Sequence, residues 1–304
     1  MTPETFFIRQ CGFVLQNRAR FRVFGADRLR YLNGQLTQDI RRVSEQLALP
    51  ACVTSAKGRL QGEVWVVAES AGPTAFLLDA PGELRETLLL RLERYIISEE
   101  VFVEDVTGLA TLIHFPCPEV PSVLNEKKIP KVSAARLGQP GWDVWVPAGS
   151  FEEVCERLDK LLGSEADYER LRILRGIPAW GSELNEETLP PEAGLDKTHV
   201  DYHKGCYIGQ EVISRLKSVG HVNRILKKLC TRANQNLGME HPLLPPPVQG
   251  DALYNPQSGE SPVGSLTSVA SDGETGFLAL GYIKRNVDMD TLKTASGWEF
   301  VVGA

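Results

Sequence analysis

Long apolar runs, clustered cysteines and a surplus of positive charge are all lacking in this sequence. Its uncharged apolar stretches are short, such as residues 65–68 and 75–78, whereas a membrane-spanning helix needs roughly 20 such residues. The chain begins Met1-Thr2-Pro3-Glu4, with an early acid where a secretory signal would carry basic residues. We therefore expect no membrane association and a cytoplasmic location.

The charge balance is acidic, with 39 acidic residues against 33 basic ones and a net charge of −6. A sequence-independent grip on nucleic acid needs a clustered basic face, so we expect no nucleic-acid partner. No CxxC pair occurs among the six cysteines, which are Cys11, Cys52, Cys117, Cys155, Cys206 and Cys230. A chain of 304 residues can bury a core without disulfides, so we expect reduced thiols.

Several standard catalytic motifs are also missing. The sequence contains no GxGxxG, no GxxxxGK[ST], no HExxH and no GxSxG. These absences argue against a standard dinucleotide fold, a P-loop, a zinc protease and an α/β-hydrolase.

The first part of the chain mixes strands and helices. Residues 49–55 and 60–68 predict two strands around the turn Lys57-Gly58-Arg59. Apolar stripes predict three helices, at residues 83–97, 151–162 and 166–175. A short helix is also predicted over residues 28–32, which Asn33-Gly34 ends. The elements alternate through hairpin-like turns rather than in strict βα order, which predicts an α+β fold.

The predicted secondary structure changes after about residue 224. Five short strands are predicted there, at residues 225–230, 251–254, 264–269, 277–283 and 298–302. Turn-forming residues separate them and no helical period appears, which is typical of a small all-β barrel. We therefore predict an α+β region over 1–224 and a C-terminal β-barrel domain over 225–304.

The most informative segment is residues 195–211, which gathers two histidines, two lysines and a cysteine. Three interpretations are open for Cys206. In the first, Cys206 packs in a polar loop. In the second, it binds a metal ion together with His199 and His203. In the third, it is a reactive thiol beside Lys204. The metal site lacks a fourth local ligand, whereas closed zinc sites show paired ligand clusters.

The stretch Lys204–Glu211, K-G-C-Y-I-G-Q-E, resembles the K-G-C-Y-x-G-Q-E signature of the YgfZ-type folate-binding proteins. That family is related to the aminomethyltransferase (T-protein) of the glycine cleavage system. Further segments resemble family blocks in the same order, namely residues 27–39, 57–59, 171–178, 189–192 and 281–285. The resemblance therefore spans nearly the whole chain.

The resemblance implies an aminomethyltransferase-type folate-binding core, with ferredoxin-like parts around a central channel and a C-terminal barrel. It implies tetrahydrofolate, or another reduced folate, as the ligand, a catalytic role for Cys206 and no metal. The residues of the matching blocks that it places near folate are Arg28, Gln35, Thr37, Asp39, Arg59, Arg172, Tyr207 and Glu211.

One departure from the transferases concerns the strand after the glycine turn. True aminomethyltransferases carry acidic residues there, but this chain has Gln61 and Gly62. Strand alternation turns Glu63 to the face opposite Gly62, so we expect no carboxylate of this strand in the channel. The glycine-cleavage reaction is therefore not expected.

Three functions remain. The first, implied by the resemblance alone, is a folate-binding accessory protein for iron–sulfur cluster assembly or repair, with iron–sulfur client or carrier proteins as partners. The second is a folate-dependent one-carbon transferase with an unknown substrate, which an acid pointing into the channel would favour. The third is an interaction protein with a decayed, blocked pocket.

The sequence also ranks the thiols. We expect Cys206 to be the most reactive, because Lys204, His203 and the start of a helix lie nearby. We expect Cys52, Cys155 and Cys230 to be buried in strands or on a helical core stripe, and Cys11 and Cys117 to lie in loops.

Overall fold

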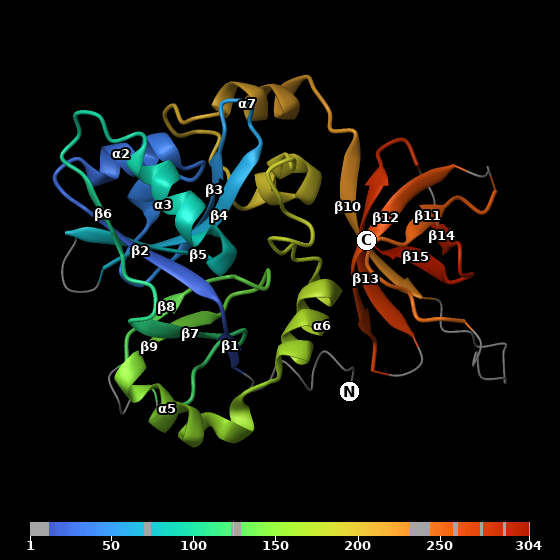
Figure 1. The fold of residues 1–304 in the computed structure, drawn as a ribbon, viewed down its shortest axis with the longest axis horizontal. Coiled ribbons are helices and arrows are strands. Elements are labelled where there is room, and N and C mark those ends of the chain that lie inside the picture. Colours follow the sequence, from blue (N-terminus) through green and yellow to red (C-terminus); the bar gives the residue numbers. More distant parts are fainter. Residues whose placement is uncertain are drawn as a thin grey trace.

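The computed structural model describes residues 12–69, 74–122, 124, 129–231, 244–257, 261–273, 276–287 and 290–303. Cys11, for which the sequence predicts a loop, lies outside these residues. Two sheets with their helices form one side of the molecule, and a separate barrel forms the other (Figure 1).

The first sheet has five antiparallel strands in the order β3-β4-β5-β2-β6. Its strands are β2 (Arg18–Phe24), β3 (Leu49–Thr54), β4 (Leu60–Ala68), β5 (Ala75–Pro81) and β6 (Phe102–Asp105). Helices α2 (Arg28–Gln35) and α3 (Arg85–Glu93) cover one face, where Leu32, Leu88 and Leu92 are fully buried in the main core. The predicted strand pair around the Lys57-Gly58-Arg59 turn is confirmed.

The second sheet is smaller and lies beside the first. Its four strands, in the order β1-β7-β9-β8, are β1 (Phe13–Leu15), β7 (Ala110–Phe115), β9 (Trp142–Pro147) and β8 (Lys131–Ser133). Helix α5 (Phe151–Leu158) packs Val154 and Leu158 into the core of this sheet. The sequence does not reveal β1 and β8, because three residues are too few for an alternating pattern to be recognised.

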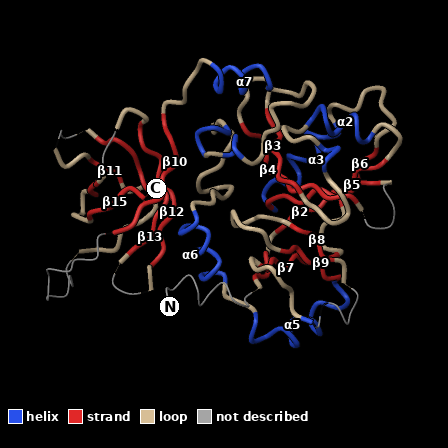
Figure 2. Tube along the Cα trace, turned by 180° about the vertical axis from the view of Figure 1, so that it is seen from behind, coloured by secondary structure: helices blue, strands red, loops and turns tan. Residues whose placement is uncertain are grey.

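Helix α6 (Glu165–Arg175) connects the sheets to the barrel. Seen from behind, it lies between the second sheet and the barrel, while α7 (Gln210–Ser218) precedes the first barrel strand (Figure 2). A Ser164–Asp167 capping box starts α6, and Gly176 in the left-handed conformation ends it. None of the helices in the described ranges is long and apolar enough to cross a bilayer.

The barrel is closed, in the strand order β10-β13-β12-β11-β14-β15. Its strands are β10 (Arg224–Thr231), β11 (Ala252–Tyr254), β12 (Pro262–Ser271), β13 (Phe277–Lys284), β14 (Thr291–Thr294) and β15 (Glu299–Gly303). The five predicted strands are confirmed, as is the α+β fold with a C-terminal barrel. The sixth strand, β14, carries a single apolar residue, Leu292, and so gives almost no sequence signal.

Helices α2 and α3 each end at a different residue from the one predicted. Helix α2 continues through Asn33-Gly34 to Gln35, because Leu32 and Leu36 are both held in the main core. Helix α3 ends at Glu93 rather than Ile97, and Ile97 is 89% exposed. Tertiary packing therefore overrides the local signal at both ends.

Two of the cysteines are not where the sequence predicted. Cys230 is exposed, because its neighbour Leu229 faces the barrel core and alternate residues of a strand point to opposite faces. Cys155 is half-buried, beside rather than on the core stripe of α5. Cys117 lies in a loop after β7, as predicted, and is buried against the core of the second sheet. The buried position of Cys52 is confirmed.

Candidate functional site

A cavity of about 570 Å³ lies between the two sheets and the barrel, and we call it the larger cavity. Its walls come from β3 and β4 of the first sheet, from residues 176–178, 193–195 and 197–199, and from Leu226 to Lys228 on β10. This volume lies within the range of small-molecule sites. The channel is therefore not blocked.

Glu63 faces this cavity. Side chains alternate between the two faces of the sheet along β4. A Cβ added to Gly62 would point at Leu84 and Leu88 of the helical layer, whereas Glu63 and Trp65 line the cavity. The predicted alternation is confirmed, but the cavity lies on the Glu63 face of the strand. The expectation that no carboxylate of this strand enters the channel is wrong.

Glu63 is held ionised by its neighbours. Its Oε1 lies 3.1 Å from Nε2 of His199. Burial alone would raise the pKa of Glu63, but the His199 hydrogen bond and the charges of Arg18 and Arg136 outweigh it and lower the pKa. The Nδ1 of His199 lies 2.7 Å from the hydroxyl of Thr198, so both ring nitrogens are engaged and the imidazole is fixed in orientation.

Arg136 lines the same wall of the cavity, but its charge is balanced by carboxylates of the protein. Its guanidinium lies 4.8 Å from the ring centre of Trp65. It also bonds Asp79 at 2.6 Å and Asp143 at 2.7 Å, and Asp79 is in turn paired with Arg18. The chain of buried ion pairs ties the first sheet to the second and stiffens the cavity wall.

A smaller cavity of about 240 Å³ adjoins the larger one. Five residues line both cavities and so mark the boundary between them, namely Glu63, Trp65, Arg136, Ile177 and Pro178. The smaller cavity also reaches Arg172, which is 2% exposed and bonds Glu183 at 3.0 Å and Ser268 of β12 at 2.9 Å. Arg172 thus links α6 to the barrel behind the cavity.

Lysines also line the larger cavity. Lys197, Lys227 and Lys228 line it but do not line the smaller cavity. Glu63 is the one acidic side chain among the described residues that line the larger cavity. The lining of the larger cavity therefore carries one acidic side chain and several basic ones.

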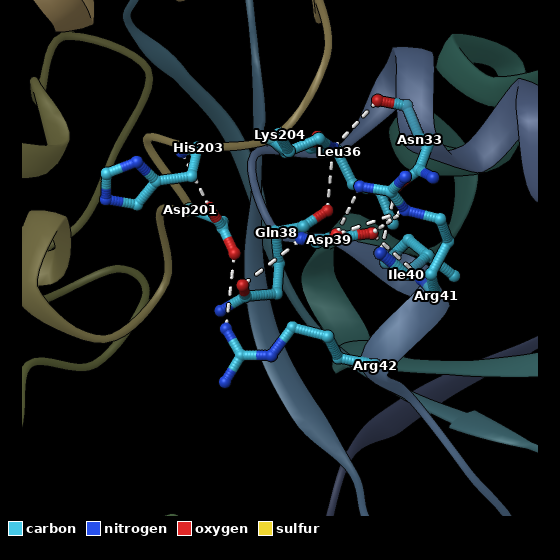
Figure 3. Close-up of polar contacts among 10 residues, drawn as sticks. All are labelled: Asn33, Leu36, Gln38, Asp39, Ile40, Arg41, Arg42, Asp201, His203 and Lys204. Carbon is cyan, nitrogen blue, oxygen red and sulfur yellow. Dashed lines mark hydrogen bonds and ion pairs between the residues drawn. The ribbon is translucent and has the colours of Figure 1, made fainter.

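The signature motif forms an exposed loop, residues 203–209, which we call the motif loop. Lys204 anchors it from below. Its ammonium is buried and donates to the carbonyl oxygens of Asn33, Leu36 and Gln38 at 2.8, 2.7 and 2.7 Å. Burial lowers the pKa of Lys204 to about 8, and the three acceptors are those of a charged amine. Figure 3 shows this anchor beneath the loop.

Asp201 fixes the entry to the loop. Its carboxylate accepts from the backbone N–H of His203 at 2.8 Å and from Arg42 at 3.2 Å (Figure 3). Its own N–H donates to the carbonyl of Thr37 at 3.0 Å. Three residues lie between His199 and His203, so one short segment connects the loop to the cavity wall.

The exit of the loop packs on the turn between β3 and β4. Gly209 has φ +86°, and a Cβ there would lie 2.5 Å from the carbonyl oxygen of Ser55, so no other residue fits. Thr54 donates its hydroxyl to the carbonyl of Ile208, and Gly58 lies directly under Val212 of α7. Segments far apart in the sequence therefore converge here.

Cys206 is exposed at the top of this loop, which confirms that its sulfur is reachable from solvent. The protons of Lys204 go to three carbonyl oxygens and are not offered to the thiol. His203 is exposed beside it. Tyr207, the next residue, is 7% exposed, and its hydroxyl has no hydrogen-bond partner among the described residues.

The remaining predicted folate residues lie under or beside the motif loop rather than in the cavity. Gln35 accepts from Arg91. Asp39 pairs with Arg41, which lowers the pKa of its carboxyl to about 2. Thr37 is a layer behind the wall, because its hydroxyl donates to the carbonyl of His199 at 2.6 Å.

Three further predicted residues are peripheral. Arg28 donates to the carbonyl of Gly25 at 2.8 Å, Arg59 pairs with Glu187 at 2.6 Å, and Glu211 is exposed in the first turn of α7. Of the predicted set, Arg172 is the member that lines one of the two cavities.

The described residues contain no group of three or more His, Cys, Asp or Glu side chains placed to hold a metal ion. His199 lines the cavity, whereas His203 and Cys206 lie on the exposed loop. The three residues of the metal interpretation are therefore not assembled into a site.

The comparisons with known proteins bear on this arrangement. No family model matches the sequence. A tRNA-modifying protein YgfZ of Colwellia psychrerythraea is 24% identical over 315 residues, covering 99% of this chain and 92% of that protein. A mitochondrial iron-sulfur cluster assembly factor IBA57 homolog of Dictyostelium discoideum is 24% identical over 253 residues, covering 71% of this chain and 62% of that protein. The corresponding IBA57 homolog of Coccidioides immitis is 26% identical over 278 residues, covering 84% and 63%.

The fold agrees with these relatives. The crystal structure of the glycine cleavage system aminomethyltransferase T of Bartonella henselae matches with a TM-score of 0.80 at 17% identity, covering 99% of this chain and 87% of that one. The chain therefore resembles the YgfZ proteins over nearly its whole length. Its fold is the aminomethyltransferase fold. The chain spans less than two thirds of the length of the two mitochondrial relatives.

The sequence signals located the motif loop and missed most of the cavity. Alternation along β4 places Glu63 and Trp65 on one face of the sheet. The sequence carried this signal, but we expected the cavity on the opposite face. Arg136 had no local signal, because a single arginine in a loop is usually solvated. Lys227 and Lys228 lie in a barrel strand and become relevant only because the barrel closes the cavity.

Proposed function

We propose that this protein binds a reduced folate in the larger cavity and acts as an accessory protein in iron–sulfur cluster assembly or repair. The observation that carries the folate part is the cavity itself, of about 570 Å³. Its lining carries one acidic side chain, Glu63, and several basic ones, and a folate has a hydrogen-bond-donating ring at one end and carboxylates at the other.

The cavity residues fit such a ligand. The Oε2 of Glu63 has no hydrogen-bond or ion-pair partner among the described residues, and an ionised carboxylate there can accept from the amino group and ring N–H of a pterin. The Trp65 side chain and the carbons of Ile177 and Pro178 supply apolar wall. The lysines supply cations for the tail.

The iron–sulfur part rests on the relatives, two of which are named as iron-sulfur cluster assembly factors. The exposed thiol of Cys206 is the group of this chain suited to engaging a cluster-bearing partner. One thiol cannot hold a cluster alone, since clusters are held by several ligands. We therefore place Cys206 at a contact with an iron–sulfur client or carrier protein.

The folate proposal is tested by titrating the purified protein with tetrahydrofolate in a calorimeter. The Glu63→Gln variant keeps the shape of the side chain but removes its charge, and we expect a roughly tenfold weaker affinity. Glu156→Gln, at an exposed residue of α5 that lines neither cavity, is the control and should bind as the parent does. Absence of binding by the parent protein would refute the proposal.

The accessory role is tested in cells that lack this gene. The activity of an iron–sulfur enzyme should be restored by the wild-type protein and not by Cys206→Ala. Cys230→Ala is a matched control, because Cys230 is also exposed but lies on the barrel. Equal restoration by both variants would refute a role for the thiol.

A second candidate function is a folate-dependent one-carbon transferase, which the position of Glu63 favours. Tetrahydrofolate, when bound, supplies the one-carbon carrier. A fixed carboxylate at the boundary of two cavities can hold or return a proton at Oε2, and His199 holds it in place. Formation of methylenetetrahydrofolate from an aminomethylated lipoyl carrier, lost in Glu63→Gln, would support this function over the first.

A further inference from the structure

The segment that leads from the cavity wall to the motif loop is bonded along its length to the buried stretch that follows α2. Thr198 and His199, at the start of the segment, line the larger cavity. The carbonyl of Thr198 accepts from Nε2 of Gln38 at 3.0 Å, and the carbonyl of His199 accepts from the hydroxyl of Thr37 at 2.6 Å. Farther along, the N–H of Asp201 donates to the carbonyl of Thr37 at 3.0 Å.

The same buried stretch also holds the motif loop. The ammonium of Lys204 donates to two of its carbonyl oxygens (Figure 3). Val200 and Tyr207, one near each end of the segment, pack in one buried cluster with Ile213 of α7. We call residues 198–208 the connecting segment and its position in this structure the closed arrangement. Because one support holds both ends, detaching the loop also detaches the cavity wall at the start of the segment.

Two buried hydroxyls make the closed arrangement less stable than its contacts alone suggest. The hydroxyls of Tyr202 and Tyr207 have no hydrogen-bond partner among the described residues. A buried polar group without a partner costs about 1–3 kcal/mol, and water would bond both hydroxyls once the segment detaches. Detachment is therefore a local opening that does not require the sheets to unfold.

A ligand in the larger cavity opposes this opening. A ligand that bonds Glu63 also depends on His199, whose Nε2 holds that carboxylate at 3.1 Å, and it contacts the wall that the connecting segment supplies. Such a ligand binds the closed arrangement and loses these contacts when the segment opens. A ligand that binds one state makes the other rarer by one plus the ratio of its concentration to Kd, which is about tenfold at about ten times Kd.

We propose that occupancy of the larger cavity stabilises the closed arrangement and so holds Cys206 in one position on the motif loop; this rests on the proposed folate function. With the cavity empty, the connecting segment opens more often and the thiol is displaced with it. Engagement of a partner through Cys206 then depends on the cavity being filled. The coupling is reciprocal, because a partner that fixes the loop also favours the closed wall and strengthens ligand binding.

Amide hydrogen exchange of the full chain, with and without tetrahydrofolate at about ten times its calorimetric Kd, tests the coupling. The amides of Asp201 and Ile208, bonded to the carbonyls of Thr37 and Gly34, should exchange about tenfold more slowly with the ligand. The amide of Leu109, bonded within an exposed turn, should be unchanged. Without the ligand, both segment amides should exchange faster than those of the central strand β5, which report global unfolding.

Matched variants of Thr37 locate the coupling. Thr37→Val removes the hydroxyl that holds the carbonyl of His199 but keeps the shape of the side chain. With tetrahydrofolate at about ten times the Kd of the variant itself, it should lose most of the protection of Asp201 and Ile208. Thr37→Ser keeps the hydroxyl and should retain the protection. Thr294→Val removes a buried hydroxyl of the barrel and should also retain it.

The outcomes separate this inference from the folate proposal. Binding of tetrahydrofolate without slower exchange of the two segment amides would overturn the coupling and leave the folate proposal standing. Segment amides that exchange as slowly as those of β5 without ligand, or full protection in Thr37→Val, would also overturn it. If Thr37→Val does not fold, the parent with and without ligand decides alone. Failure of tetrahydrofolate to bind would overturn both proposals.

Discussion

Replacing Lys204 by methionine removes the anchor of the motif loop while keeping the length and most of the volume of the side chain. The change leaves the carbonyl oxygens of Asn33, Leu36 and Gln38 without their charged donor. Two of these carbonyls lie at the C-terminal end of α2, where helix acceptors lack internal partners. The variant therefore weakens both the helix end and the loop above it.

The magnitude follows from the contacts. A hydrogen bond from a charged donor contributes about 1.5–3 kcal/mol, and Lys204 makes three such bonds. The burial that lowers the pKa of Lys204 to about 8 shows that placing the ammonium there carries a cost, which offsets part of the sum. Water entering beside Asn33 recovers another part, which leaves a net loss of about 3 kcal/mol.

Thermal unfolding measures this loss. At about 2 °C per kcal/mol for a chain of this size, Lys204→Met should melt about 6 °C below the parent. Lys57→Met, an exposed lysine of the β3–β4 turn, should melt within about 1 °C of the parent. Amide exchange over residues 203–209 should also accelerate in Lys204→Met. A melting temperature equal to that of the Lys57→Met control would show that the three hydrogen bonds do not hold the loop.

Three other predictions address separate parts of the molecule. Cys206→Ala should melt within about 1 °C of the parent because the side chain is exposed. Limited alkylation with peptide mapping should modify Cys206 before Cys155 and leave Cys52 untouched. Modification of Cys206 no faster than of Cys155 would contradict this. The pKa of Asp39 is about 2 in the folded protein, below its usual 3.8, so its carboxylate contributes stability above about pH 4 that is lost as the pH falls towards 2. The difference in unfolding free energy between the parent and Asp39→Asn should therefore close over that pH interval. A constant difference would refute the assignment. Arg172→Met leaves Glu183, 1% exposed, without its cation and should cost about 3–5 kcal/mol in a denaturant titration, while Arg94→Met, on the surface, should cost less than about 0.5 kcal/mol.

Local patterns carried much of the fold. The alternation in β4 and the turn residues between β3 and β4 predicted that hairpin because a strand repeats every two residues whatever surrounds it. The barrel was visible from its short strands and turn-forming residues. The motif loop could be identified because its glycines, lysine and cysteine lie within one short stretch of the sequence, which includes Gly209.

The cavity could not be obtained in the same way. Alternation showed that Glu63 and Gly62 point in opposite directions, but only the packing of Leu84 and Leu88 against Gly62 decided which direction is core and which is cavity. The exposure of Cys230 was likewise set by the side of β10 that Leu229 fills.

The sequence by itself determined the hairpins, the barrel strands, the extent of most helices and the identity of the signature loop, because these depend on interactions between residues close in the chain. Only the tertiary structure decided that Glu63, Arg136, His199 and Lys228 surround one cavity. They come from β4, a loop of the second sheet, the segment before the motif loop and the barrel. Their meeting depends on how two sheets and a barrel pack, and such long-range packing leaves no periodic trace in any one segment.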